Sequence, residues 1–151
     1  MRNGLFTVCG VVEIEGRVLF VRHTYGFAKD KILCPGGYVK ENELPTQAIE
    51  REILEETGVV VRARSILSVQ FMVDQWCVVF DCEYVSGTPR SDGRENSEVT
   101  LLPPQEAVVR DDITNMSREL MKIYLKESRA TLPKNSFIQR TFTDANYVLF
   151  G

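Results

Sequence analysis

The feature that most constrains the fold is the segment 37–59, which reads GYVKENELPTQAIEREILEETGV. Its middle predicts a helix, because Pro45 suits a first helical turn and Gly58 suits the left-handed residue that often ends one. Ile49 and Ile53, four residues apart, give this helix an apolar edge that can pack against a sheet. The segment therefore predicts a loop, a helix docked through one edge, and a second loop.

Three glutamates of this helix, Glu52, Glu55 and Glu56, are spaced so that their carboxylates share one helical face. Like charges placed in this way repel each other, so the helix gains no stability from them. Mg²⁺ and Mn²⁺ take oxygen ligands and are often held by a few carboxylates together with substrate phosphates. The pattern predicts a divalent-cation site, and the alternative is an exposed polar helix face.

The rest of the chain alternates strands and turns in one unit. Its 151 residues are 44% hydrophobic and 26% charged, which is ordinary for a single soluble domain. Apolar runs bounded by turn residues predict strands at 5–14, 18–22, 59–61, 66–73, 76–85 and 98–102. Helical spacing predicts a second helix within 113–128, and residues 146–150 suggest an edge strand or a dimer contact.

Charge and cysteine usage exclude several classes of protein. The net charge of −3 leaves no basic face for duplex nucleic acid, and no apolar run approaches the roughly 18 residues of a membrane span. The four cysteines, which lack paired metal-ligand spacing, are Cys9, Cys34, Cys77 and Cys82. We expect reduced, buried thiols in a cytoplasmic protein, and no zinc site, because His23 is the only histidine.

The segment 37–59 resembles the Nudix box of hydrolases that act on nucleoside diphosphates linked to another moiety. The matching positions are Gly37, Glu43, Arg51, Glu52, Ile53, Glu55, Glu56, Gly58 and Val59. The resemblance implies an α/β fold, an α/β/α sandwich with a central mixed β-sheet. We expect one Nudix hydrolase domain over 1–151, with residues 131–151 as a C-terminal extension.

The resemblance also implies a reaction and a set of roles. The expected activity is metal-dependent cleavage of a pyrophosphate bond in a nucleoside triphosphate, an ADP-ribose-like compound or a related molecule. The cofactor is expected to be Mg²⁺, with Mn²⁺ as a substitute. Glu52, Glu55 and Glu56 are the expected catalytic residues and metal ligands, and the identity of the general base stays open among them. The expected structural residues of the motif are Gly37, Glu43, Arg51 and Gly58.

Residues outside the box are candidates for further contacts. A fourth metal ligand is expected from Glu95 or Glu98, and Glu95 is preferred because it lies six residues before Leu101, where relatives often carry tryptophan. A solvated loop carboxylate explains Glu95 equally well. Candidate substrate-binding residues are Arg22, His23, Tyr25 and Phe27. Core or loop packing is the alternative for the three ring-bearing residues, and a surface role at the end of a strand is the alternative for Arg22.

Two broader interpretations remain open. The preferred one is an enzyme whose partner is a small nucleotide, and its rival is a non-catalytic nucleotide sensor on the same fold. Such sensors generally carry eroded boxes or an attached DNA-binding domain, and this sequence shows neither feature. The apolar end of the tail allows a homodimer, and the box does not specify the substrate.

Overall fold

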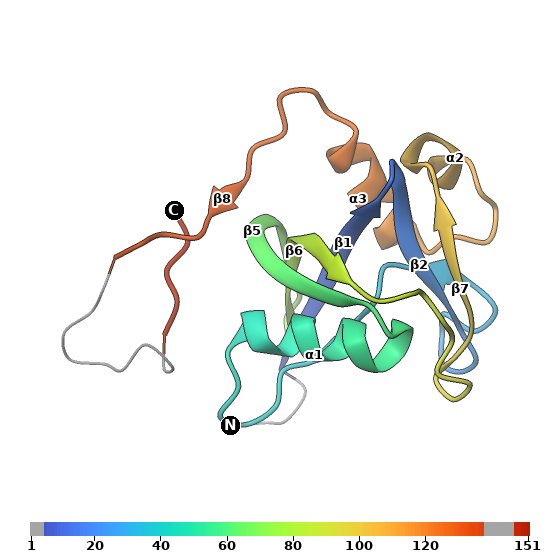
Figure 1. Cartoon of the computed structure of the whole chain (residues 1–151), viewed down its shortest axis with the longest axis horizontal. Helices are drawn as coiled ribbons and strands as arrows, with labels where there is room; N and C mark the ends of the chain where they lie inside the picture. Colours follow the sequence, from blue (N-terminus) through green and yellow to red (C-terminus); the bar gives the residue numbers. More distant parts are fainter. Residues whose placement is uncertain (1–4, 138–146) are drawn as a thin grey trace.

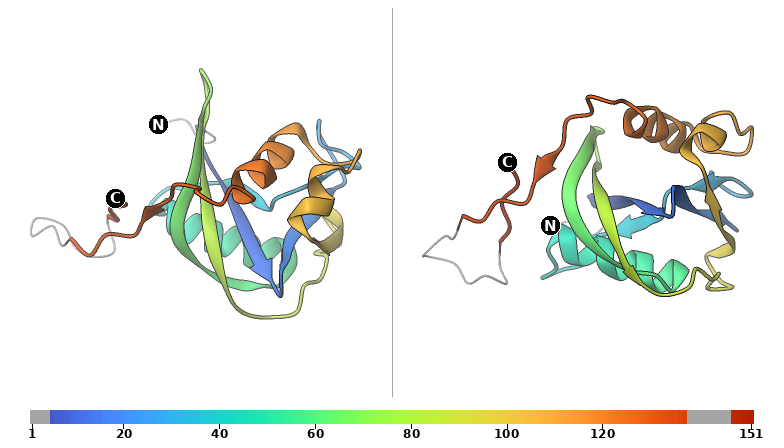
Figure 2. Two further views of the ribbon diagram at one scale, coloured as in Figure 1. Left: turned by 90° about the horizontal axis from the view of Figure 1, so that it is seen from above. Right: turned by 45° about the horizontal axis from the view of Figure 1, so that its top comes forward.

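The strands and helices of the chain form three layers (Figure 1). The computed structural model describes residues 5–137 and 147–151. Its strands are β1 (Phe6–Ile14), β2 (Arg17–His23), β3 (Ile32–Leu33), β4 (Gly36–Tyr38), β5 (Val60–Phe71), β6 (Trp76–Ser86), β7 (Asn96–Leu102) and β8 (Leu132–Pro133). Its helices are α1 (Pro45–Thr57), α2 (Pro104–Val108) and α3 (Asn115–Tyr124). The two views of Figure 2 show α1 on one side of the strands, and α2 and α3 on the other.

The sheet contains both parallel and antiparallel pairs. Strand β1 pairs in parallel with β6, whereas β1–β2, β1–β4, β2–β7 and β5–β6 are antiparallel. The strand order is β3-β2-β1-β6-β5-β8, with β4 also paired to β1 and β7 to β2. A parallel pair requires a long connection, and the chain between β1 and β6 contains α1. This arrangement confirms the predicted α/β/α sandwich around a mixed sheet.

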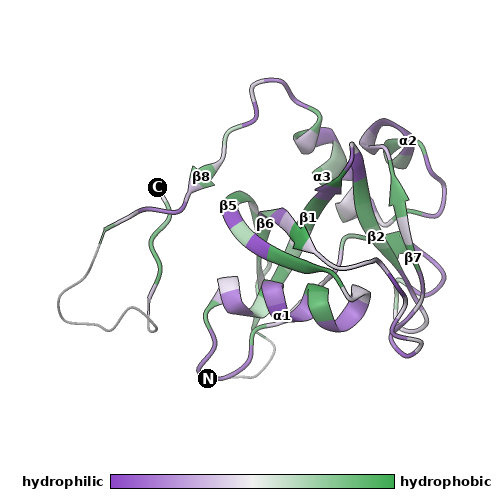
Figure 3. Cartoon of the chain, in the orientation of Figure 1, coloured by the Kyte–Doolittle hydropathy of each residue, from purple (hydrophilic) through white to green (hydrophobic). Residues whose placement is uncertain are grey.

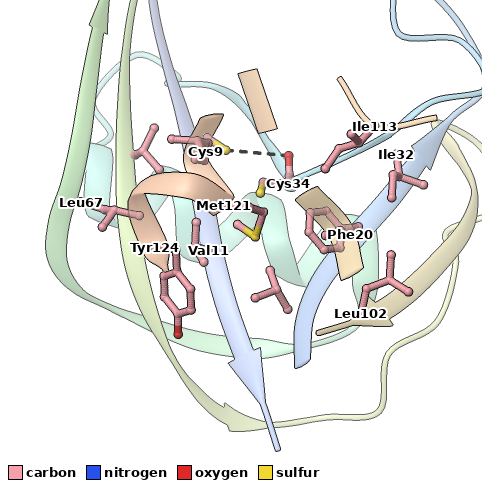
Figure 4. Close-up of a cluster of buried hydrophobic side chains, with 14 of the residues drawn as sticks. Cys9, Val11, Phe20, Ile32, Cys34, Leu67, Leu102, Ile113, Met121 and Tyr124 are labelled. Carbon is pink, nitrogen blue, oxygen red and sulfur yellow. Dashed lines mark hydrogen bonds between the residues drawn. The ribbon is translucent and has the colours of Figure 1, made fainter. Parts of the chain in front are cut away.

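Each face of the sheet has its own apolar core. The core on the α1 side includes Ala48, Ile49, Ile53, Val12, Leu19 and Phe80. The core on the α3 side, drawn in Figure 4, includes Cys9, Val11, Phe20, Ile32, Met121 and Tyr124. Figure 3 shows that the strands are mainly hydrophobic, whereas α1 alternates between hydrophobic and hydrophilic residues. Helix α1 is therefore anchored through one edge, and its polar face is left for other contacts.

Some elements differ from the sequence predictions. Strand β5 is continuous, although the sequence predicts two strands there. The register of its pairing with β6 shifts at three places, and these shifts explain the wrong prediction. A bulge inserts an extra residue and interrupts the alternation of apolar and polar side chains. Strand β4 lies where the predicted loop before the helix begins; it pairs through its backbone with β1 and is too short to show a pattern. Helix α2 was not predicted, and α3 is shorter than the predicted 113–128.

The cysteines and the tail can also be compared with the predictions. All four cysteines are buried and free, as predicted. Within residues 5–137 and 147–151, no helix has the length and apolar character that crossing a bilayer requires. In the tail, Lys134 forms a β-bridge with Phe150, while residue 146 of the predicted edge strand lies outside the described residues.

Candidate active site

Helix α1 has a fixed orientation against the sheet. Its buried apolar residues are Ala48, Ile49 and Ile53. Gly58 ends the helix with φ 73°, and its N–H donates to the Leu54 carbonyl at 2.9 Å. Glycine adopts this left-handed conformation without the steric cost of a side chain. With both its edge and its end fixed, the helix directs Glu52 and Glu56 toward β4.

Arg51 connects this helix to the preceding loop and to two of the glutamates. Its Nε and Nη2 donate to the Glu43 carboxylate at 2.7 and 2.9 Å, a two-point contact that suits the planar guanidinium. Its Nη1 donates to Glu52 at 2.9 Å and to Glu55 at 3.2 Å. The hydrogen bonds from Arg51 hold the pKa of Glu43 below its usual value. Arg51 thus sets the direction of the carboxylates of Glu52 and Glu55.

Glu52 packs against the backbone of β4. Its side chain is 13% exposed, whereas that of Glu55 on the same face is 54% exposed. A Cβ at Gly37 would overlap the Glu52 carboxyl group, so this close approach requires glycine. Burial raises the pKa of Glu52, and the ion pair with Arg51 opposes that rise. Glu52 is therefore held in place, while most of Glu55 faces solvent.

Glu56 is a buried carboxyl group without a cationic partner. The residue is 2% exposed, and its Oε1 has no hydrogen-bond partner. The pKa of Glu56 is raised to about 9, mainly by burial and in addition by the charges of Glu52 and Glu95, while the N–H of Gly36 acts in the opposite direction. An ionised carboxylate in such a place is costly unless it is paired. Glu56 is stable there when it carries a proton or contacts a cation.

The two candidate loop glutamates lie in different surroundings. The charge of Glu95 raises the pKa of both Glu52 and Glu56, so Glu95 lies close enough to act on the acidic face. Glu98 instead accepts a hydrogen bond from Nε of Arg22 at 2.8 Å. Of the two, Glu95 is the one that the structure brings to the site.

The aromatic loop after β2 borders the same carboxylates. The rings of His23 and Tyr25 stack with centroids 5.3 Å apart and planes 12° apart. Burial raises the pKa of Tyr25, and the charges of Glu95 and Glu56 add to this rise. Burial also lowers the pKa of His23. Phe27 is 96% exposed. The His23–Tyr25 pair therefore lies at the site, while Phe27 projects into solvent.

Arg22 is already bonded through all three of its side-chain nitrogens. Its Nε donates to Glu98 at 2.8 Å, its Nη1 to the Asp30 carbonyl at 2.8 Å and its Nη2 to Asp112 at 3.0 Å. Arg110 also donates to Asp112, and the two arginines hold the pKa of that carboxyl well below its usual range. These three bonds engage three of the five N–H donors of Arg22 and tie its side chain to the protein.

Sequence reasoning missed Asn96, the first residue of β7. Asn96 is fully buried, and its Nδ2 donates to the main-chain carbonyl of Glu56 at 2.9 Å. Asp92 Oδ1 accepts hydrogen bonds from the N–H groups of Arg94 at 2.9 Å and Asn96 at 3.1 Å. The dipeptide Asp92-Gly93 could have indicated this turn. Nothing local indicates Asn96, because its contact joins residues 40 positions apart.

Comparison with known proteins decides the family. The model of the NUDIX domain matches residues 2–123. The chain belongs to the NUDIX family. It is 32% identical to an ADP-ribose pyrophosphatase of Methanocaldococcus jannaschii over 68 residues, which are 45% of this chain and 40% of that protein. It is 32% identical to a MutT-like protein of Streptomyces ambofaciens over 103 residues, which are 66% of this chain and 64% of that protein.

A solved structure supports the same assignment. A crystal structure of a NUDIX hydrolase from Nitrosomonas europaea matches with a TM-score of 0.73 and 26% identity, covering 82% of this chain and 71% of that chain. The matches to the two relatives from Methanocaldococcus jannaschii and Streptomyces ambofaciens cover less than two thirds of those proteins. The comparisons thus establish the family and the fold of this Nudix chain.

The donor atoms of the Nudix helix fit a small, hard cation. Among the described residues, no group of three histidine, cysteine or acidic side chains forms a ready-made metal site. Mg²⁺ does not require one, because it is often bound by one or two carboxylates plus substrate phosphates and water. Glu56 has a free buried oxygen, and Glu52 lies beside it with one oxygen bonded to Arg51. Both supply the carboxylate oxygens that Mg²⁺ and Mn²⁺ prefer.

A separate cavity lies away from the Nudix helix. Its volume is about 900 Å³, and its lining includes Glu13, Arg64, Asp81, Tyr124 and Arg129. Arg64 pairs with the buried Asp81 at 3.1 Å. None of the predicted site residues lines this cavity, so it is distinct from the acidic site.

Proposed function

We propose that this Nudix chain hydrolyses a phosphoanhydride bond in a nucleoside diphosphate linked to another moiety, with Mg²⁺ or Mn²⁺ as its cofactor. Glu56 is the observation that carries the proposal, because it is a buried carboxyl group with an unpaired oxygen beside a second, largely buried carboxylate. An exposed polar helix face would leave Glu56 in solvent. A divalent cation would compensate the charge that the surrounding protein leaves uncompensated.

The residues of α1 and the β7 loop supply the parts of this reaction. Phosphoanhydrides resist water because their negative oxygens repel the nucleophile and charge builds up on the leaving phosphate. A bound divalent cation neutralises that charge and lowers the pKa of water bound to it. Glu52, Glu55 and Glu56 would hold the cation, and Glu95 would add a carboxylate from the loop. Arg51 keeps the carboxylates in a fixed direction before the substrate arrives.

One carboxylate must also take the proton of the attacking water. Glu52 is suited to this role because Arg51 binds its Oε1 and the backbone at Gly37 restricts its movement. Its second oxygen can accept the proton. Glu55 and Glu56 are the alternatives, and their removal should affect cation binding before proton transfer.

The substrate proposed is a nucleoside triphosphate or an ADP-ribose-like compound. The stacked rings of His23 and Tyr25 offer a flat surface beside the carboxylates, and aromatic rings bind nucleobases by stacking. Phe27 is exposed near this pair in the chain, and Arg22 lies where β2 ends. The name of the Methanocaldococcus jannaschii relative, ADP-ribose pyrophosphatase, supports an ADP-ribose-like substrate.

We further propose that the chain forms one domain with residues 131–151 as an extension. We also propose that the protein is cytoplasmic and forms a homodimer.

A turnover screen tests the proposal. The purified chain is incubated with a saturating excess of Mg²⁺, roughly a hundredfold over its dissociation constant. The panel of compounds contains nucleoside triphosphates, ADP-ribose, nucleotide sugars and dinucleoside polyphosphates. We expect phosphate-containing products from at least one compound, identified by mass spectrometry, and none when a chelator replaces Mg²⁺. Binding without turnover across the whole panel would contradict the proposal and favour the sensor.

A further inference from the structure

The loop that carries Glu95 is fixed on two sides. The N–H and hydroxyl groups of Thr24 donate to the main-chain carbonyl of Glu95 at 3.1 and 3.2 Å. On the other side, Asn96 Nδ2 donates to the Glu56 carbonyl at 2.9 Å. Figure 1 shows the chain just before β7 near the C-terminal end of α1. Asn96 therefore joins the loop directly to the residue with the buried carboxyl group.

The contacts of Asn96 determine which way its amide faces. Only Nδ2 can donate to the carbonyl oxygen of Glu56, so the remaining side-chain atom is Oδ1, an acceptor. The main chain is held as well, because the N–H of Asn96 donates to Asp92 at 3.1 Å and its carbonyl accepts from the Ser91 hydroxyl at 2.9 Å. The side chain is buried, and its Oδ1 has no hydrogen-bond partner. Asn96 thus presents a fixed acceptor without a donor.

Glu56 and Asn96, which are hydrogen-bonded to each other, each have a buried side-chain oxygen without a hydrogen-bond donor. Within the described part of the chain, the buried side-chain oxygen and nitrogen atoms without a partner are Glu56 Oε1 and Asn96 Oδ1. An unsatisfied buried acceptor lowers stability, so a fold has no structural reason to keep one on each of two residues that are hydrogen-bonded to each other. Both are hard oxygen atoms of the kind that Mg²⁺ and its bound waters satisfy.

We propose that Asn96 is a further member of the cation site, with its Oδ1 accepting a hydrogen bond from the hydration shell of the cation that Glu56 binds. The inference rests on the proposed function, because it takes a cation at Glu56 as given. In this role Asn96 is a positioning residue, since its Nδ2 holds the end of α1 while its Oδ1 orients the hydration shell. Groups that orient the ligands of a metal commonly change its affinity by about 10–100-fold when they are removed.

Two substitutions at this position separate the proposal from a purely structural role. Asn96→Ala removes both the donor to Glu56 and the free oxygen. Asn96→Asp also removes the donor but keeps an oxygen at the same place. Ser97→Asp, at the exposed neighbouring position, is the matched control for the added negative charge. Circular dichroism and metal-free melting curves show that each variant folds, and Asn96→Ser replaces the alanine variant if that one does not.

The measurement is the dissociation constant for Mn²⁺ without substrate, from calorimetry or electron paramagnetic resonance. We expect Asn96→Ala, or Asn96→Ser in its place, to weaken binding about 10-fold or more, while Asn96→Asp binds at least as well as the wild type and better than Ser97→Asp. Unchanged binding in Asn96→Ala, or equal weakening in Asn96→Ala and Asn96→Asp, would overturn the inference. If the wild type itself binds no Mn²⁺, that result contradicts the cation dependence in the proposed function, and with it the role of Asn96.

Discussion

Two clusters of charged residues differ in how their charges are balanced. The first surrounds Arg22 of β2, and the second lies at the end of α1. In the first cluster, Glu98 and Asp112 accept hydrogen bonds from Arg22 at 2.8 and 3.0 Å, and Arg110 also binds Asp112. The pKa of Asp112 is lowered as a result. In the second cluster, Glu56 is buried without a cation, and its pKa is raised to about 9.

The difference separates residues that stabilise the fold from residues that serve a ligand. Glu98 and Asp112 are both bonded to Arg22 within the chain, and the lowered pKa of Asp112 means that its ionised form adds to stability. Glu56 has no such compensation, and ionising it opposes folding until a positive charge joins it. Carboxyl groups in one small domain therefore serve either the fold or a ligand, and their surroundings rather than their residue type decide which.

The largest expected effect is that of Glu56→Gln. We expect kcat to fall about 1,000-fold, a loss of about 4 kcal/mol of transition-state stabilisation, because a cation ligand would be lost. The metal-free variant should unfold at a higher temperature than the wild type at pH 8, since a buried ionisable group has been removed. Kinetics with the substrate found by the screen and melting curves in chelator measure both effects. Glu50→Gln, on the same helix, is the control, and equal kcat values for the two variants would contradict the assignment.

A smaller effect is expected when Glu95, in the loop before β7, is compared with Glu98 in β7. Glu95→Gln should raise the Mg²⁺ concentration needed for half-maximal activity about 10-fold, because Glu95 lies at the acidic face. Glu98→Gln should leave that concentration within about twofold and lower the free energy of unfolding by about 0.5–1 kcal/mol, since it loses only an ion pair with Arg22. Mg²⁺ titrations and urea unfolding of both variants measure this. A larger effect of Glu98→Gln on Mg²⁺ dependence would reverse the assignment of the loop ligand.

A further effect, which does not depend on knowing the substrate, is expected in the pH dependence of metal-free stability. The pKa of Glu56 is raised from 4.5 to about 9 on folding, so its contribution is complete below pH 4.5 and is lost as the pH rises toward 9. The pKa of Asp112 is lowered from 3.8, so its contribution is present above pH 3.8 and is lost as the pH falls below that value. Urea unfolding in chelator from pH 3 to 9 should therefore show a decline on both sides, of about 1 kcal/mol on the acidic side and larger, several kcal/mol, on the alkaline side, because the pKa of the buried Glu56 moves furthest.

Single substitutions identify the residue behind each decline. Glu56→Gln should flatten the alkaline side alone, and Asp112→Asn should flatten the acidic side alone. In the wild type, saturating Mn²⁺ should remove the alkaline decline in the free energy of unfolding, because a cation that binds only the folded protein stabilises it. An alkaline decline that persists in Glu56→Gln would assign it to another group.

The comparison between sequence and structure is informative at particular residues. The limits of α1, its buried edge at Ile49 and Ile53, and its end at Gly58 agree with prediction, because helix ends and helical periodicity depend on neighbouring residues. Strand β5 was divided incorrectly, because a bulge is a property of pairing with β6. Arg22 was predicted as a substrate contact, and only the fold shows that Glu98 and Asp112 already bind it.

The sequence by itself determined the family resemblance, the helix with its acidic face and the kind of ion that such a face suits. These conclusions depend on spacings of three and four residues, which a helix converts directly into neighbouring side chains. Only the tertiary structure decided that Glu56 is buried with one oxygen unbonded while Glu55 is exposed, and that Asn96 contacts Glu56. The pairing of β4 with β1 and of β7 with β2 brings these distant segments to the helix, and no local pattern encodes that approach.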